Sequence, residues 1–167
     1  LLNAVVASGV AAKQWSARAD TVWIDFSKGL GAPMGACLAG SEETIDMAWL
    51  WKHRLGGAMR QSGLMAAAAL HALDHHVDRL ADDHDRASRL AGALSGLGAE
   101  VVDPDTNMVF FDPGPCGVDG TEVVEGLAER GVRVSLIGNT VRAVTHLDVD
   151  DTDIDGAIAA FSEVLSR

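Results

Sequence analysis

The sequence is short of several features, and each shortage narrows the class of protein. Only two cysteines, Cys37 and Cys116, occur in 167 residues, far apart and without a CxxC pair. No disulfide framework is indicated, and a reducing, cytoplasmic setting is expected. No apolar run reaches the roughly 18 residues that a membrane span needs. The first residues include neither Met nor a basic segment, so we expect no signal peptide and a start inside a longer gene product.

Basic residues are also scarce. Thirteen Lys and Arg stand against 24 Asp and Glu, giving a net charge of −11, which argues against nucleic acid or an anionic membrane as a partner. The charge is uneven, because the segment Met47–Leu73 contains no acid but holds Lys52, Arg54 and Arg60. Such a segment favours a local anion site. A buried or subunit-facing surface accounts for it equally well.

Residues 1–97 carry the pattern of an incomplete α/β domain. Residues 21–26 and 34–39 are predicted as short strands from their β-branched and apolar composition. Helices are predicted over residues 41–56, 60–80 and 82–97 from Ser41 as an N-cap and from the 3.6-residue apolar period. Two strands are too few to bury these apolar helices, so we expect the sheet to need further strands that precede Leu1.

Residues 98–167 are predicted to form a small α+β domain with an open sheet covered by helices on one face. The predicted elements are strands at 100–102 and 108–111, a helix at 120–130, strands at 132–136 and 141–145, and a helix at 154–165. The predicted fold class is therefore α/β, with a partial large domain over residues 1–97 and the small domain over residues 98–167.

The first candidate for chemistry is Lys28, which directly follows the first predicted strand in a turn loosened by Gly29 and Gly31. An amine in that place can be dry and closely approached. A desolvated lysine can act as a nucleophile, a Schiff-base partner or a general base, and neighbouring glycines admit a flat ligand. On this evidence alone, a solvated turn lysine remains the commoner interpretation.

Four ordered motifs resemble the low-specificity L-threonine aldolases. They are Leu-Asn-Ala at residues 2–4, Ser-Lys-Gly-Leu-Gly-Ala-Pro-Met-Gly at 27–35, Leu-Gly-Gly-Ala-Met-Arg-Gln-Ser-Gly at 55–63 and Val-Arg-Ala-Val-Thr-His-Leu-Asp at 141–148. That family belongs to the pyridoxal-phosphate (PLP) dependent β-eliminating lyases of the aspartate-aminotransferase-like fold type I. The resemblance covers essentially the whole chain and implies that the chain is the C-terminal part of such an enzyme. Residues 1–97 would belong to the PLP-binding large domain, whose three-layer, mostly parallel sheet is incomplete here.

The resemblance also assigns roles to three residues. Lys28 occupies the place of the lysine that holds PLP as a Schiff base, leaving the ring as electron sink for cleavage of the Cα–Cβ bond. Arg60 matches an arginine that reaches the cofactor phosphate, often across a subunit boundary, and its place near a helix start favours an anion. Arg142 matches the arginine that pairs with the substrate α-carboxylate through two parallel hydrogen bonds.

The implied function is cleavage of a β-hydroxy-α-amino acid such as threonine into glycine and an aldehyde. In the family, the acid that pairs with the ring nitrogen, a histidine at the ring face and a phosphate-binding cup precede the lysine, and Leu1–Ser27 contain none of these. Activity is therefore expected only with an N-terminal half. A non-catalytic fragment, a serine hydroxymethyltransferase-like activity and an amino-acid racemase remain alternatives.

Two further expectations concern partners and metals. The apolar helix at 60–80 and the missing strands leave surface uncovered, so we expect a homo-oligomer, a dimer or tetramer. No metal site is expected: His71 and His75 lack a third ligand, and the calcium-loop-like segment at 151–156 has Ser162 where a loop glutamate is required. We expect residues 150–153 to start a helix instead.

Overall fold

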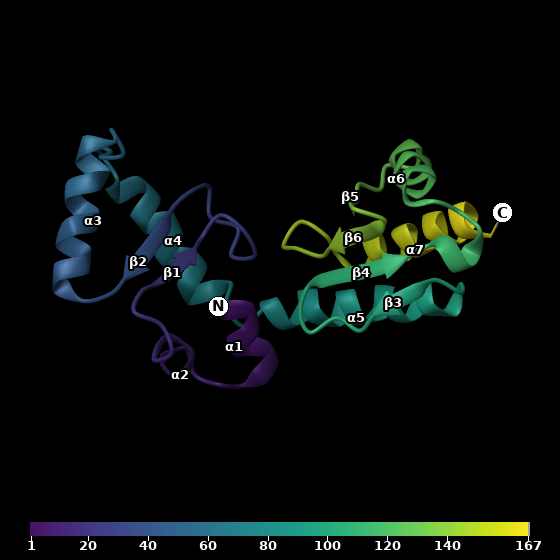
Figure 1. Ribbon diagram of the computed structural model, residues 1–167, viewed down its shortest axis with the longest axis horizontal. Coiled ribbons are helices and arrows are strands. Elements are labelled where there is room, and N and C mark those ends of the chain that lie inside the picture. Colours follow the sequence, from purple (N-terminus) through teal and green to yellow (C-terminus); the bar gives the residue numbers. More distant parts are fainter. Residues whose placement is uncertain (167) are drawn as a thin grey trace. The chain divides into compact units, whose positions relative to one another are not determined.

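The computed structural model describes residues 1–166, which form two compact units, Leu1–Leu80 and a second from Ala81 onward (Figure 1). The sequence placed the domain boundary between residues 97 and 98, at the other end of helix α5 (Leu80–Gly96). In the structure this helix buries Leu90 and Leu94 in the core of the second unit, which is why the units divide before it. Each unit is described by itself.

The first unit contains a two-stranded antiparallel sheet and four helices. Strand β1 (Val22–Asp25) pairs with β2 (Ala36–Ala39). The helices are α1 (Leu2–Ser8), α2 (Ala12–Ser16), α3 (Glu42–Arg54) and α4 (Gly63–His75). The predicted N-cap of α3 is confirmed, since Ser41 Oγ accepts a hydrogen bond from the Thr44 N–H at 3.3 Å. The small core of this unit consists of Phe26, Leu30, Ala32, Ala69, Ala72 and Leu80.

The second unit is a four-stranded sheet with three helices: four strands and two helices were predicted for residues 98–167, and α5, which the sequence assigned to the large domain, is the third helix. The strands are β3 (Glu100–Val102), β4 (Met108–Asp112), β5 (Ser135–Ile137) and β6 (Thr140–Val144), in the order β3-β4-β6-β5. Every strand pair described within residues 1–166 is antiparallel. Helices α6 (Gly120–Glu129) and α7 (Asp151–Leu165) join α5, and a short 3-10 turn lies at Gly114–Cys116.

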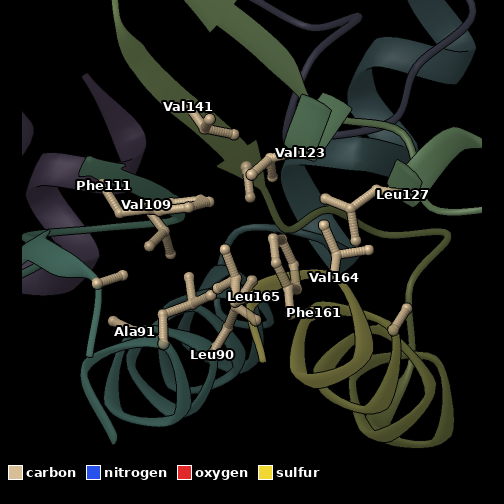
Figure 2. Close-up of a cluster of buried hydrophobic side chains, with 14 of the residues drawn as sticks. Leu90, Ala91, Val109, Phe111, Val123, Leu127, Val141, Phe161, Val164 and Leu165 are labelled. Carbon is tan, nitrogen blue, oxygen red and sulfur yellow. The ribbon is translucent and has the colours of Figure 1, made fainter. Parts of the chain in front are cut away.

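Alternation along the two central strands decides which face of this sheet is buried. Val109 and Phe111 of β4 and Val141 of β6 are fully buried, and Phe111 meets Phe161 of α7 edge to face with ring centroids 5.6 Å apart. Figure 2 shows these strand side chains pointing into the same interior as those of the helices. Because side chains alternate along a strand, Arg142 of β6 lies on the opposite face.

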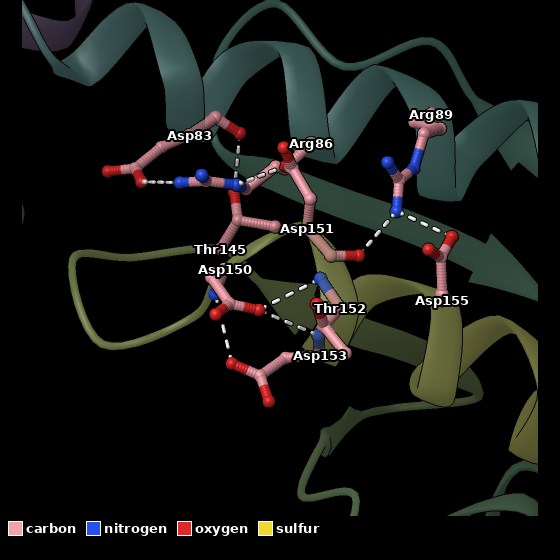
Figure 3. Close-up of polar contacts among 9 residues, drawn as sticks. All are labelled: Asp83, Arg86, Arg89, Thr145, Asp150, Asp151, Thr152, Asp153 and Asp155. Carbon is pink, nitrogen blue, oxygen red and sulfur yellow. Dashed lines mark hydrogen bonds and ion pairs between the residues drawn. The ribbon is translucent and has the colours of Figure 1, made fainter.

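The start of α7 is fixed by a cap and by two arginines of α5. Asp150 accepts hydrogen bonds from the backbone N–H groups of Thr152 and Asp153, so the helix-start interpretation of these residues is confirmed. Arg86 and Arg89 of α5 pair with Asp151 and Asp155 of α7 at 2.9 and 2.8 Å (Figure 3). Within residues 1–166, no helix is long and apolar enough to cross a bilayer.

Candidate active site

Lys28 lies on a turn whose backbone is fixed on both sides. After β1, the Phe26 N–H donates to the Gly35 carbonyl at 3.0 Å, and the Ala32 N–H donates back to the Phe26 carbonyl at 2.8 Å. Within this frame the Gly31 N–H closes a tight turn onto the Lys28 carbonyl at 2.8 Å, and Gly31 adopts a left-handed φ of 68°. Glycine adopts that conformation at no steric cost. The turn is therefore held in one place relative to the strand.

A histidine directly after α4 ties the same turn to the rest of the first unit. Leu30, two residues after Lys28, is buried, and its carbonyl accepts a hydrogen bond from His76 Nδ1 at 2.6 Å. Because a carbonyl only accepts, Nδ1 carries the proton. Sequence reasoning did not single out His76, since nothing local in the chain relates it to a residue 46 positions away.

The Lys28 side chain is exposed and ion-paired. Its Nζ lies 3.1 Å from Asp25 Oδ2, with 76% of the lysine side chain and 25% of the aspartate side chain exposed. The other carboxylate oxygen accepts from Ser27 N–H at 3.0 Å and Ser27 Oγ–H at 2.8 Å. The bond from the Ser27 hydroxyl, followed by the one from Lys28 and then by the one from the Ser27 N–H, lowers the pKa of Asp25 below its usual value. In this chain the turn leaves the amine open to solvent, as in the commoner interpretation of a turn lysine.

A cavity of about 230 Å³ adjoins this amine. Gly29 forms the wall of the cavity next to Lys28. A Cβ added at Gly29 would lie 3.1 Å from Leu80 Cδ2 and 3.6 Å from Asn3 Nδ2. A side chain there would thus crowd the cavity beside the amine. The lining residues are Leu1, Leu2, Asn3, Trp23, Ile24, Asp25, Lys28, Gly29, Leu30 and Leu80.

Arg60 lies in the exposed turn that precedes α4, three residues before the helix starts. The next residue, Gln61, has a φ of 52°, which is uncommon for a residue other than glycine. Ser62 is the N-cap of α4 but makes no capping hydrogen bond through its side chain. Strained backbone of this kind is often found at functional sites. Within the described residues, no hydrogen bond or ion pair joins Arg60 to Lys28.

Arg142 belongs to the second unit and projects from the middle of β6, in register with Phe110 of β4 and Ser135 of β5. Its Nε–H donates to Ser135 Oγ at 3.2 Å, and Ser135 Oγ–H donates to the Arg142 carbonyl at 3.5 Å. The serine thereby orients the guanidinium through Nε. The two terminal NH₂ groups remain for an incoming carboxylate, the geometry in which arginine binds such a group with two parallel bonds.

Sequence reasoning found the three basic residues and missed their polar neighbours. Asp25 and Ser27 stand inside the quoted motif, and an aspartate followed two residues later by serine is a known turn pattern that could have pointed to the contact. Ser135 carries no such signal, because its bond to Arg142 depends on the pairing of β5 with β6. Within residues 1–166, no cluster of three or more His, Cys, Asp or Glu side chains is suited to hold a metal ion.

Comparison with known proteins decides the family. A family model described as beta-eliminating lyase matches residues 1–113. The chain belongs to the beta-eliminating lyase family. The low specificity L-threonine aldolase of Escherichia coli K12 is 39% identical over 167 residues, which are 100% of this chain and 49% of that protein. Low-specificity L-threonine aldolase 1 of Arabidopsis thaliana is 34% identical over 175 residues, covering 99% of this chain and 48% of that protein.

Solved structures confirm the fold class. A putative aromatic amino acid beta-eliminating lyase/threonine aldolase from Exiguobacterium sp. 255-15 superposes with a TM-score of 0.74 at 21% identity, over 98% of this chain and 50% of that one. A putative L-allo-threonine aldolase from Listeria monocytogenes EGD-E gives 0.70 at 19% identity, over 98% and 49%. The predicted mixed α/β fold with partial sheets is therefore confirmed. The chain spans about half the length of the curated relatives it matches.

Proposed function

We propose that the chain is the lysine-bearing part of a PLP-dependent aldehyde-lyase that cleaves a threonine-like β-hydroxy-α-amino acid into glycine and an aldehyde. The observation that carries this proposal is the similarity over the whole chain to proteins named L-threonine aldolase, combined with Lys28 on a fixed turn beside an open cavity. The chain covers about half of such a protein, so the activity is proposed for the complete enzyme.

The residues around the turn fit covalent attachment of PLP. The Lys28 amine is open to an aldehyde, and the absence of a Cβ at Gly29 keeps the adjoining cavity free. When bound, PLP supplies an electron sink that accepts the electrons of the breaking Cα–Cβ bond. The groups expected to hold the ring nitrogen and most of the phosphate are not among residues 1–166. We therefore assign this chain the lysine and one arginine of the cofactor site.

Each basic residue has a distinct task in this proposal. Lys28 would hold the cofactor covalently and would keep a proton available at Nζ. Arg60 balances the negative charge of the cofactor phosphate, in a segment that also carries Lys52 and Arg54 and no acid. Arg142 binds the substrate α-carboxylate and so fixes which bond at Cα is aligned for cleavage.

A second copy of the chain is the proposed partner of the surface formed by α3 and the turn after it. Trp49, Trp51, Leu55 and Met59 are exposed by 52, 49, 79 and 51%. Exposed apolar surface of this density marks an interface. Lys52 lies over the Trp49 ring at 4.5 Å, which suits a rim that is partly polar.

Both cysteines are free thiols, which fits the proposed cytoplasmic setting.

The role of Lys28 is tested in the complete enzyme with two lysine variants. Lys28→Ala is expected to abolish glycine release from threonine and to lose the yellow absorbance of bound PLP after dialysis. Lys13→Ala, at an exposed position of α2, is the matched control and should retain both. Glycine release that persists in Lys28→Ala would remove Lys28 from its role. Wild-type protein that neither retains PLP nor releases glycine would favour the non-catalytic alternative.

A further inference from the structure

We propose that Asp25 is a positioning residue that holds Lys28 as an ion-paired ammonium and thereby limits how fast the lysine reacts. This inference rests on the proposed function of Lys28. The observation behind it is the contact of 3.1 Å between Lys28 Nζ and Asp25 Oδ2, two residues that line the cavity.

The carboxylate is the fixed member of this pair. Asp25 ends β1, in register with Ala36 of β2, and its Oδ1 is held by both the N–H and the hydroxyl of Ser27. These two bonds occupy one carboxylate oxygen and leave Oδ2 directed at the lysine. Lys28, with a largely exposed and flexible side chain, is the member that moves. Asp25 therefore determines where the ammonium rests when nothing else binds it.

The ion pair opposes the chemistry that the lysine has to perform. To attack an aldehyde, the nitrogen needs its lone pair, so the ammonium first loses a proton to solvent. The amine then forms a carbon–nitrogen double bond, and the aldehyde oxygen leaves as water. A neighbouring carboxylate stabilises the ammonium relative to the amine. Removing its charge therefore raises the fraction of reactive amine at neutral pH.

The charged groups around the turn indicate that Asp25 is the carboxylate that acts on Lys28. Among the side chains that line the cavity, Asp25 is the carboxylate and Lys28 the cation. The nearest titratable group seen to contact the turn is His76, the C-cap residue of α4, whose Nδ1 is engaged by the Leu30 carbonyl.

The charge of Asp25 can be removed while its turn is kept. In Asp25→Asn the amide oxygen still accepts both bonds from Ser27, whereas the amide NH₂ that replaces Oδ2 cannot pair with an ammonium. Asp46→Asn, at an exposed position of α3, removes the same charge elsewhere in the first unit. The chain contains three lysines, so Lys13 and Lys52 report any general change in reactivity within each sample.

Trace labelling with acetic anhydride, read by peptide mass spectrometry, measures the reactivity of each lysine whether or not PLP binds. At pH 7, Asp25→Asn should label about two- to fivefold faster at Lys28, the factor of an exposed ion pair, with Lys13 and Lys52 unchanged. The difference should vanish at strongly alkaline pH, where lysine side chains lose their proton, and shrink in about 1 M salt. Addition of PLP to the same proteins should show the same order of rates.

Equal labelling of Lys28 in wild type and Asp25→Asn at pH 7, or an equal rise at all three lysines, would overturn the inference. A rise that persists unchanged at high pH would also overturn it, because a loosened turn rather than a lost charge would then be the cause. Faster acetylation of Lys28 without any reaction with PLP would leave the inference standing and count against the proposed function.

Discussion

Thr145→Val is expected to destabilise the second unit through one buried hydroxyl. Thr145 follows β6 and is 2% exposed. Its Oγ1–H donates to the Asp83 carbonyl of α5 at 2.6 Å (Figure 3). The backbone N–H of Thr145 donates to the Asn107 carbonyl at 3.0 Å, and the Thr145 carbonyl accepts a hydrogen bond from Asn107 Nδ2 at 2.8 Å. These bonds fasten to α5 the end of the strand that carries Arg142.

The size of the effect follows from what valine keeps and what it loses. Valine has nearly the same shape as threonine, so no cavity forms, and the backbone bonds to Asn107 remain. Loss of the hydroxyl removes one hydrogen bond, which lowers the free energy of unfolding by about 1 kcal/mol. The loss reaches up to about 2 kcal/mol because the acceptor is buried. For a domain of roughly 60–100 residues, each kcal/mol lowers the unfolding midpoint by about 4–8 °C. We therefore expect a decrease of about 4–16 °C.

The distribution of aromatic residues supplies the assay. All four tryptophans, Trp15, Trp23, Trp49 and Trp51, lie in the first unit. Tryptophan fluorescence therefore follows the first unit, and far-ultraviolet circular dichroism follows both. The dichroism transition assigned to the second unit should shift in Thr145→Val. Thr140→Val, on the same strand but only partly buried, should stay within about 0.5 kcal/mol of wild type. A wild-type midpoint in Thr145→Val, or an equal loss in Thr140→Val, would refute the reasoning.

Two predictions concern the other proposed contacts. In the complete enzyme, Arg142→Lys should lower kcat/KM for threonine about ten- to hundredfold, mainly through KM, because it loses a planar pair of charge-assisted hydrogen bonds; unchanged kinetics would exclude Arg142 from carboxylate binding. Trp51→Glu should reduce the oligomer to a smaller species in light scattering while Trp15→Glu, an exposed tryptophan on α2, does not; a monomeric wild type would contradict the proposed interface.

The sequence predicted elements well where local chemistry specifies them. The start of α3 follows from Ser41, and that of α7 from Asp150, because both caps are short-range bonds. The helix predicted over residues 60–80 was too long at both ends. It begins at Gly63, after the left-handed Gln61, and ends at His75. Its alanine-rich composition contains no stop signal, and its end is fixed by a tertiary bond from His76.

Elements that depend on distant partners were predicted less well. The strand expected at residues 132–136 is observed at Ser135–Ile137, because pairing with β6 sets its position. Helices α1 and α2 were not predicted, since neither has a side-chain cap or an acid in its first turn. Packing of Leu2 and Val6 against the core of the first unit accounts for α1. Short helices without caps are stable only through such contacts.

The candidate site shows the same division. Lys28, Arg60 and Arg142 were found by motif, whereas the contacts that orient them were not. The exposed state of Lys28 could not be read from the sequence, because a turn after a strand is compatible with a buried or a solvated amine. Its pairing with Asp25 depends on how the turn directs two side chains three residues apart. Motifs thus pointed to the candidate residues, and the structure supplied the side chains that contact Lys28 and Arg142.

The residues proposed to act on the cofactor and on the substrate differ in how firmly their side chains are held. Arg142 stands in a four-stranded sheet whose core includes Phe111 and Phe161, so its guanidinium, held through Ser135, is preorganised for a carboxylate. Lys28 stands on a fixed turn, yet its side chain is exposed and free to exchange partners. A residue that forms and releases a covalent bond in each cycle needs a mobile side chain. A residue that aligns the substrate is less effective when its side chain moves. The ion pair with Asp25 gives the mobile lysine a defined resting place without fixing it there.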